Sequence, residues 1–265
     1  MGKYWAYFKL SLQTILEYRG DMVIYTLNNG AMPLVGLLIW LAAASGGAKL
    51  AIAAPDLIVY FLLAAWVNIV VFSWGSWYVY EIIDKGDFYK YLIKPFSLAW
   101  GFAAENGAQQ VLKTVVISAV ILIIAVVLSR SYPLHLRVTP LSLLLFLPSL
   151  VMTGLIVFYI ELCLGLTAFW VYDIDFLTNT YNMLNQLLSG RLIPLVFLPA
   201  GLASASTFMP FRYTLSFPIE VLLNKVGGYE ELLGFMIQII WLGATFVLYR
   251  LLYQQGAKNY QGFGG

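Results

Sequence analysis

Long runs without a charged residue are the feature that most constrains this chain. Residues 57–80 contain no charge, and neither do residues 140–160. About 20 apolar residues are enough for a helix to cross a bilayer. With 61% hydrophobic and 11% charged residues, the chain also lacks the polar side chains that a soluble protein of this length needs to cover its surface. The sequence therefore predicts an all-α integral membrane protein, with the lipid bilayer as its surroundings.

Six membrane-spanning helices are predicted within a single transmembrane domain, residues 21–254. Residues 176–211 contain a single charge but are too long for one span at 1.5 Å per residue, so the region is divided. The fourth span has an alternative end near residue 170, beyond Glu161. The predicted spans are residues 22–44, 57–80, 112–129, 140–160, 178–199 and 232–249.

Residues 1–20 are predicted to form an amphipathic interfacial helix that lies in the plane of the lipid head groups. A single stripe of this helix carries its apolar and aromatic side chains, and the charged side chains lie elsewhere on it. Most Lys and Arg residues fall on the side of both chain termini in this topology, which predicts that both termini are cytoplasmic. Residues 255–265 then form a cytoplasmic tail. The stripe consists of Tyr4, Trp5, Phe8, Leu12, Ile15 and Leu16.

A polar segment, residues 81–94, separates the second and third predicted spans. An ordinary cytoplasmic loop explains its lysines but not the interleaved Phe88, Tyr89, Tyr91 and Leu92. Aromatic residues mixed with charge are typical of a docking surface, so we expect a short helix that a soluble partner binds. The residues assigned to this coupling role, within segment 81–95, are Asp84, Lys85, Gly86, Asp87, Phe88, Lys90, Tyr91 and Leu92.

Two charges, Glu161 and Arg191, fall within or beside adjacent predicted spans. A charge at the centre of a bilayer costs about 2.5–3.5 kcal/mol on insertion scales, so each is expected to face protein or water. Three interpretations stay open: a structural ion pair, a part of a substrate path, and spans whose ends are drawn wrongly.

Prolines recur near the end of the chain, where the sequence stays apolar. Proline removes a backbone donor and breaks helices, and the freed carbonyls must be buried in protein or in a wet cavity. Residues 200–228 are therefore predicted to form outer re-entrant helices that act as a gate or lid. The residues assigned to this outer gate are Pro199, Pro210, Phe211, Arg212 and Pro218.

Catalysis and cofactor binding are not expected of this chain. It contains no G-x-x-x-x-G-K-[ST] loop for nucleotide phosphates. One histidine and one cysteine do not supply a zinc site or a histidine-based nucleophile. No catalytic, cofactor-binding or metal-binding residue is assigned, and the net charge of +2 gives no reason to expect nucleic acid.

Motifs along essentially the full length resemble the type-2 permeases of ATP-binding-cassette (ABC) exporters. Ile83-x-x-Gly86-x-Phe88-x-x-x-Leu92-x-Lys94-Pro95 is similar to the coupling segment of that family. The tail, residues 256–265, resembles the glycine-containing tail of one bacterial branch. The motifs that resemble the fifth span and the outer re-entrant helices are Ser189-Gly190, Pro194, Phe197-x-Pro199, Pro210-Phe211 and Pro218.

The resemblance implies a non-catalytic permease subunit in the bacterial inner membrane. Two copies of a separate ATPase subunit would bind ATP and magnesium, and a second permease would complete a homodimer or heterodimer. The resemblance then assigns the coupling role to residues 84–92 and the outer gate to residues 199–220. It does not identify the substrate. Two alternatives stay open, namely a secondary transporter driven by an ion gradient and a membrane scaffold without transport.

Overall fold

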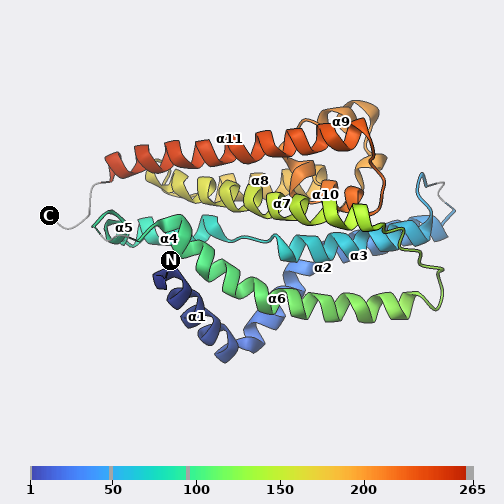
Figure 1. The fold of residues 1–265 in the computed structure, drawn as a ribbon, viewed down its shortest axis with the longest axis horizontal. Coiled ribbons are helices and arrows are strands. Elements are labelled where there is room, and N and C mark those ends of the chain that lie inside the picture. Colours follow the sequence, from blue (N-terminus) through green and yellow to red (C-terminus); the bar gives the residue numbers. More distant parts are fainter. Residues whose placement is uncertain (1, 48–49, 94–95, 261–265) are drawn as a thin grey trace.

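The chain folds into a bundle of long helices that run along its longest dimension (Figure 1). The computed structural model describes residues 2–47, 50–93 and 96–260, and within these residues all regular structure is helical. Helix α1 and the C-terminal end of α11 lie toward one end of the bundle, and the short helices α9 and α10 lie toward the other half (Figure 1). The predicted all-helical class is confirmed.

Five helical stretches of the described residues are long and apolar enough to cross a membrane. The sixth predicted span, residues 178–199, is not among them. Its helix α8 (Asp175–Leu188) has only 14 residues, or about 21 Å, and a bilayer core is about 30 Å thick. Gly190 then takes a positive φ of 86°, which turns the chain out of the helix. The count of six is therefore not confirmed. The five stretches are Arg19–Ser45, Ala54–Asp84, Leu98–Leu128, Pro140–Phe169 and Tyr229–Lys258.

The second predicted span is not one continuous helix, which corrects the sequence interpretation. Helix α3 (Ala54–Val70) ends within the uncharged run of residues 57–80, and helix α4 (Gly75–Asp84) begins only after a short non-helical link. In this link the side-chain amide of Gln110 donates a hydrogen bond to the carbonyl of Phe72. The carbonyl freed by the break thus finds a donor inside the protein, as a membrane span requires.

The other spans match their predictions with different ends. Helix α2 (Arg19–Ser45) contains the first predicted span, and α6 (Leu98–Leu128) begins well before the predicted third one. Helix α7 (Pro140–Leu166) continues into the 3-10 helix η1 (Thr167–Phe169), so the alternative later end of the fourth span is confirmed. A capping box of Thr139 and Ser142 starts α7, with Pro140 in its first turn. Helix α11 (Tyr229–Asn259) contains the last span.

Lys113 on α6 is buried inside the bundle. Its side chain is 1% exposed and donates a hydrogen bond of 2.8 Å to Gln109. Its ammonium also lies 4.9 Å from the ring centroids of both Tyr25 and Phe72. Two aromatic faces and an amide oxygen thus compensate the buried charge.

Helix α1 (Gly2–Glu17) packs along α6 and lies within the predicted helical segment of residues 1–20, of which residues 19 and 20 belong to α2. The Tyr7 hydroxyl donates to Glu105 at 2.7 Å, and the backbone N–H of Ser97 donates to the Tyr4 hydroxyl at 3.0 Å. Burial, followed by the bond to Glu105, raises the pKa of Tyr7 above its ordinary value. Nothing in the structure tests the predicted interfacial position of α1.

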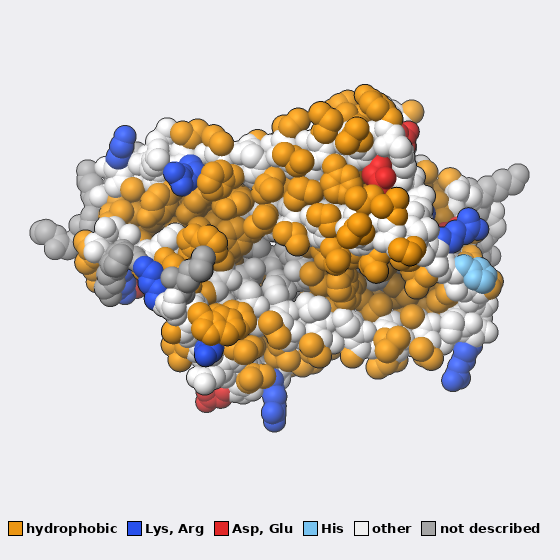
Figure 2. Space-filling model, in the orientation of Figure 1, with side chains coloured by type: hydrophobic (Ala, Val, Ile, Leu, Met, Phe, Trp, Pro, Cys, Tyr) orange, Lys and Arg blue, Asp and Glu red, His pale blue; other side chains and the backbone are white. Residues whose placement is uncertain are grey.

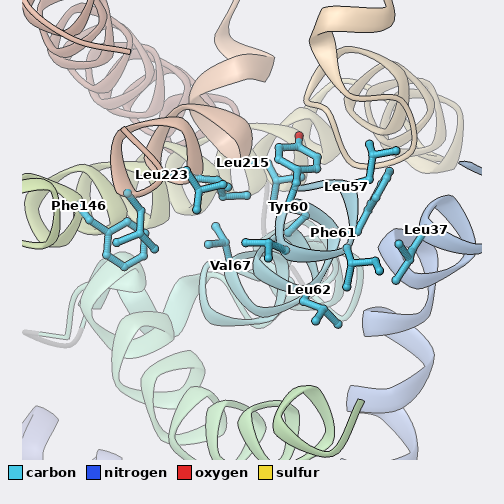
Figure 3. Close-up of a cluster of buried hydrophobic side chains, with 14 of the residues drawn as sticks. Leu37, Leu57, Tyr60, Phe61, Leu62, Val67, Phe146, Leu215 and Leu223 are labelled. Atoms are coloured by element: carbon cyan, nitrogen blue, oxygen red, sulfur yellow. The ribbon is translucent and has the colours of Figure 1, made fainter. Parts of the chain in front are cut away.

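A first core, the α3 cluster, surrounds α3. It joins Leu37 of α2, Phe61 of α3 and Phe146 of α7 to Leu215 and Leu223, which flank the short helix α10 (Ser216–Leu222) (Figure 3). Most of α3 is buried. Because α10 also packs against α7, it is enclosed by the bundle rather than lying on its surface.

A second core, the Phe88 cluster, forms where α4, the start of α6, the end of α7 and the end of α11 meet. Its buried members include Val79, Phe88, Phe102, Leu166 and Tyr249. It shares no buried residue with the α3 cluster, and the α3–α4 link lies between the two.

Candidate functional site

The polar segment forms a turn and a short helix between α4 and α6. Helix α4 ends at Asp84, and α5 covers Tyr89–Ile93. Gly86, between them, has φ of +72°, a conformation that glycine adopts without a steric cost. The hydroxyl of Tyr260 donates a hydrogen bond to the Gly86 carbonyl, so the turn is attached to the end of α11. Lys94 and Pro95 of the predicted motif lie outside the described residues.

Phe88 lies inside the protein, which corrects the expectation that it faces a partner. Its side chain is fully buried, with its ring centroid 4.9 Å from that of Phe169, 5.3 Å from that of Tyr260 and 5.6 Å from that of Tyr253. Burying a side chain of this size contributes about 1.5–3 kcal/mol. Phe88 therefore anchors the segment to η1 and to the end of α11.

The outer face of the segment remains available to a partner. Asp84, Lys85, Tyr89 and Leu92 are exposed. Two ion pairs lie within the segment, Lys85 with Glu81 and Lys90 with Asp87, the latter with 2.7 Å between Nζ and Oδ2. The hydrogen bond to Asp87 raises the pKa of Lys90, which keeps this lysine charged at neutral pH.

Tyr91 points the other way from this face. It is half-buried, and its hydroxyl lies 3.0 Å from the hydroxyl of Tyr78 on α4. Of the eight predicted coupling residues, Phe88 and Tyr91 thus connect the segment to the bundle, and the others form or shape its outer face.

The anchor of Phe88 depends on residues that the sequence did not identify as contacts. Gly256 of α11 is the clearest of them, because a Cβ atom there would lie 2.1 Å from the ring of Phe169. Phe169 in turn packs edge-on against Phe88. The signal in the sequence is the position of Gly256, which lies near the end of a long helix and between Tyr253 and Tyr260.

Glu161 is a residue of α7 whose side chain lies beside the first turn of α4, and it is 9% exposed. Its Oε2 accepts hydrogen bonds from the Ser76 hydroxyl at 2.6 Å and from the Ser76 backbone N–H at 3.3 Å. A carboxylate in this position satisfies a free N–H of the helix and interacts favourably with the helix dipole. Glu161 therefore holds the second half of the broken span against α7.

The predicted partner of Glu161 is not in direct contact with it. The ion pairs between described residues are Lys85–Glu81, Lys90–Asp87 and Arg212–Glu220, so Glu161 and Arg191 are not within 4.0 Å of each other. Arg191 lies just after Gly190, in the non-helical chain that follows α8, and its Nε atom is buried without a hydrogen-bond partner.

Aromatic donors from three other helices satisfy the carbonyls of the broken segment after α8. The Tyr60 hydroxyl of α3 donates to Gly190 at 2.8 Å, and the Trp40 indole of α2 donates to Leu192 at 3.0 Å. The Trp241 indole of α11 donates to Phe208 at 2.9 Å. The sequence predicted freed carbonyls here, but it did not predict which side chains bind them.

The predicted outer-gate residues lie on or directly before three short helices. Pro199 precedes α9 (Ala200–Ser206), Pro210 begins the 3-10 helix η3 (Pro210–Thr214), and Pro218 lies within α10. Phe211 and Arg212 follow Pro210 on η3.

Arg212 forms an ion pair within this region of short helices. Its Nη2 and Nε lie 2.6 Å and 3.1 Å from Oε2 of Glu220, and its guanidinium carbon is 5.6 Å from the ring centroid of Phe217. Both charged side chains are largely buried, at 15% and 16% exposure. The pair therefore links η3 to α10, a contact that the sequence did not predict.

Comparison with known proteins identifies one family. Residues 52–264 match the model of a family described as ABC-2 family transporter protein. The match covers the coupling segment, the broken segment after α8 and all of α11. No curated protein and no solved structure matched the chain.

Proposed function

The chain belongs to the ABC-2 family of transporter proteins, and on this premise we propose that it is an export permease driven by a separate ATPase subunit. As a multi-pass membrane protein of that family, it is a transporter permease. The sequence contains no phosphate-binding loop, so in this proposal ATP hydrolysis takes place on the partner.

The two-sided coupling segment is the observation that carries this proposal. Its outer face offers Asp84, Lys85, Tyr89 and Leu92 to a soluble subunit, while Phe88 is fixed on its inner side. A force applied to the outer face passes through Phe88 to η1 and α11. It also passes through α4, whose first turn is bound to Glu161, into α7.

The proposed assembly contains two permeases, identical or related, and two ATPase subunits that bind ATP and magnesium. Both termini and the coupling segment lie on the cytoplasmic side of the bacterial inner membrane. Residues 199–220, held closed by the Arg212–Glu220 pair, form the outer gate. The sixth crossing is proposed to consist of α8 and the broken segment that follows it.

The test is purification of the tagged chain from its native membrane, with its partners identified by mass spectrometry. We expect an ATPase subunit in stoichiometric amount. In the triple variant Asp84→Lys, Asp87→Lys and Lys90→Asp the internal pair of residues 87 and 90 is kept with its charges exchanged, so the turn stays intact while its outer charge changes. The ATPase should be lost from this variant.

Glu230→Lys is the matched control, because Glu230 is exposed at the start of α11, far from the segment (Figure 1). It should retain the ATPase. If no ATPase copurifies with the natural chain and reconstituted transport follows a proton gradient alone, the proposal is wrong and the secondary-transporter alternative takes its place.

A further inference from the structure

A cavity of about 820 Å³ lies between α6, α7 and α11 and is not used by the coupling mechanism. Trp100 of α6 and Phe246 of α11 line it and are 64% and 39% exposed, so the cavity opens to the side of the bundle. Figure 2 shows this side of the molecule hollowed between α11 and α6. In a membrane-spanning protein, such a lateral opening faces lipid.

The lining of the cavity becomes more polar along the bundle. The wall nearer the middle contains Val70, Leu155 and Phe246, with the amide of Asn106 beside them. Toward the end of α11 and the start of α6, Ser97, Arg250 and Gln254 join it. Because α6 leaves the coupling segment and α11 ends beside it, the polar part lies on the side of α5.

Arg250 supplies the charge of this polar part. It directly follows residues 232–249, which contain no charge, so it lies where the apolar part of α11 ends. Its guanidinium carbon is 5.6 Å from the ring centroid of Phe246, another residue of the cavity wall, and it has no acidic partner among the described residues. A guanidinium at the boundary of the hydrocarbon region is well suited to bind a phosphate through two parallel hydrogen bonds.

We propose that this cavity binds one phospholipid with an anionic head group, taken from the leaflet on the side of α5. The phosphate binds Arg250, and one acyl chain lies along the apolar wall of Val70 and Leu155. The volume lies within the range of about 300–1,000 Å³ that is usual for small-molecule sites. This lipid is a resident ligand, and its binding requires neither the ATPase nor transport.

Gly154 of α7 offers a direct way to fill the cavity. It lines the cavity, and a Cβ atom built on it meets no atom within 4 Å. Gly154→Leu therefore places a side chain toward the space assigned to the acyl chain, and its Cβ atom meets no clash. Gly243 of α11 also has nothing within 4 Å but does not line the cavity, so Gly243→Leu is the matched control.

The test is native mass spectrometry of the purified chain in detergent with added phosphatidylglycerol or phosphatidylcholine. The natural chain and Gly243→Leu should each retain one phosphatidylglycerol, and Gly154→Leu should bind it at least about tenfold more weakly. Arg250→Gln should remove the preference for phosphatidylglycerol over phosphatidylcholine. Gly107→Leu, where the nearest atom is the ring of Phe8 at 3.9 Å, fills the cavity from α6 if Gly154→Leu does not fold.

The proposal is overturned if Gly154→Leu retains as much phosphatidylglycerol as the natural chain does. It is also overturned if the natural chain retains phosphatidylglycerol and phosphatidylcholine equally. Inorganic phosphate is added alone in a parallel thermal-unfolding measurement. If it stabilises the chain as well as phosphatidylglycerol does, the site is an anion site that needs no acyl chain. If Gly154→Leu instead separates a dimer and leaves lipid retention unchanged, the cavity is covered by a second copy.

Discussion

Three aromatic side chains solve the problem that a broken helix creates inside a membrane protein. The carbonyls of Gly190, Leu192 and Phe208 no longer bond within a helix, and an indole or a phenol from another helix donates to each. Tyr and Trp suit this task because each combines a large apolar body with one polar hydrogen. The donors hold the broken segment to α2, α3 and α11 at once.

The bond from Tyr60 to Gly190 can be tested by a single substitution. Tyr60→Phe keeps the ring but leaves the buried Gly190 carbonyl without a donor, so we expect a loss of about 1–3 kcal/mol in the free energy of unfolding. Thermal unfolding in detergent measures this loss. Tyr172→Phe, on a side chain that is 89% exposed, should change nothing. Equal stability of both variants would show that the carbonyl finds another donor.

Glu161 is predicted to act as a hydrogen-bond acceptor for Ser76. Glu161→Gln keeps an oxygen for the Ser76 hydroxyl, whereas Glu161→Leu leaves two buried donors of Ser76 without a partner. The Leu variant should therefore be less stable than the Gln variant by about 1–3 kcal/mol. Denaturant unfolding of the two purified variants decides the point. If both lose the same stability, the negative charge rather than the hydrogen bonds is what matters.

Residue roles were only partly predictable, because composition shows that a residue is unusual but not where it points. Phe88 was singled out as an aromatic in a polar segment, yet it faces inward because Gly256 leaves room for Phe169 beside it. Glu161 was singled out as a charge within a span, but its partner is Ser76, an ordinary residue of an apolar run. Such contacts join positions far apart in the sequence.

At the scale of elements, close approach of helices depends on glycine at two crossings. A Cβ atom on Gly165 of α7 would lie 2.7 Å from the backbone oxygen of Ser76, so α4 and α7 are in contact through their backbones. Gly256 plays the same part for α11, where a Cβ atom would lie 2.1 Å from the ring of Phe169. These two positions fix how α4, η1 and α11 surround the coupling segment.

Gly256→Ala should loosen the coupling segment without unfolding the bundle. The new methyl group displaces Phe169, and the pocket of Phe88 loses one wall. We expect faster hydrogen–deuterium exchange of the backbone amides at residues 85–93, measured by mass spectrometry. Gly243→Ala, on the same helix with open space around it, should leave the exchange unchanged. Unchanged exchange in both variants would mean that Phe88 is not the anchor.

The two helix breaks differ in how far the sequence predicts them. The break after α8 contains Gly190 and several prolines, and the sequence predicts irregular structure from residue 200 onward, whereas the helix ends earlier, within the predicted span of residues 178–199. The link between α3 and α4, residues 71–74, contains neither residue type, although Ser73 lies in it and Gly75 directly follows it, and no charge marks it. It is stabilised by Gln110 and Glu161, which lie on α6 and α7. Tertiary contacts here override a local preference for helix.

At the scale of the whole molecule, the proposed orientation predicts which ends are reachable from each side of the membrane. The native Cys163 is buried at 7% exposure and can be replaced by alanine. Tyr172→Cys and Glu230→Cys then place single exposed thiols near opposite ends of the bundle. A membrane-impermeant maleimide should label residue 172 only in inside-out vesicles and residue 230 only in right-side-out vesicles. Reversed labelling would invert the orientation, and labelling of both on one side would remove the spanning topology.

The separation of the α3 cluster from the Phe88 cluster has a consequence for how such chains diverge. The two cores share no buried residue, and the short link of residues 71–74 joins the end of α3 to the start of α4. A substitution in one core is therefore compensated within that core, and its effect on the other is small. Among relatives, each core should accumulate changes as its own group. A chain can then adapt the end that contains the coupling segment to a new partner while the half that contains the proposed outer gate keeps its sequence.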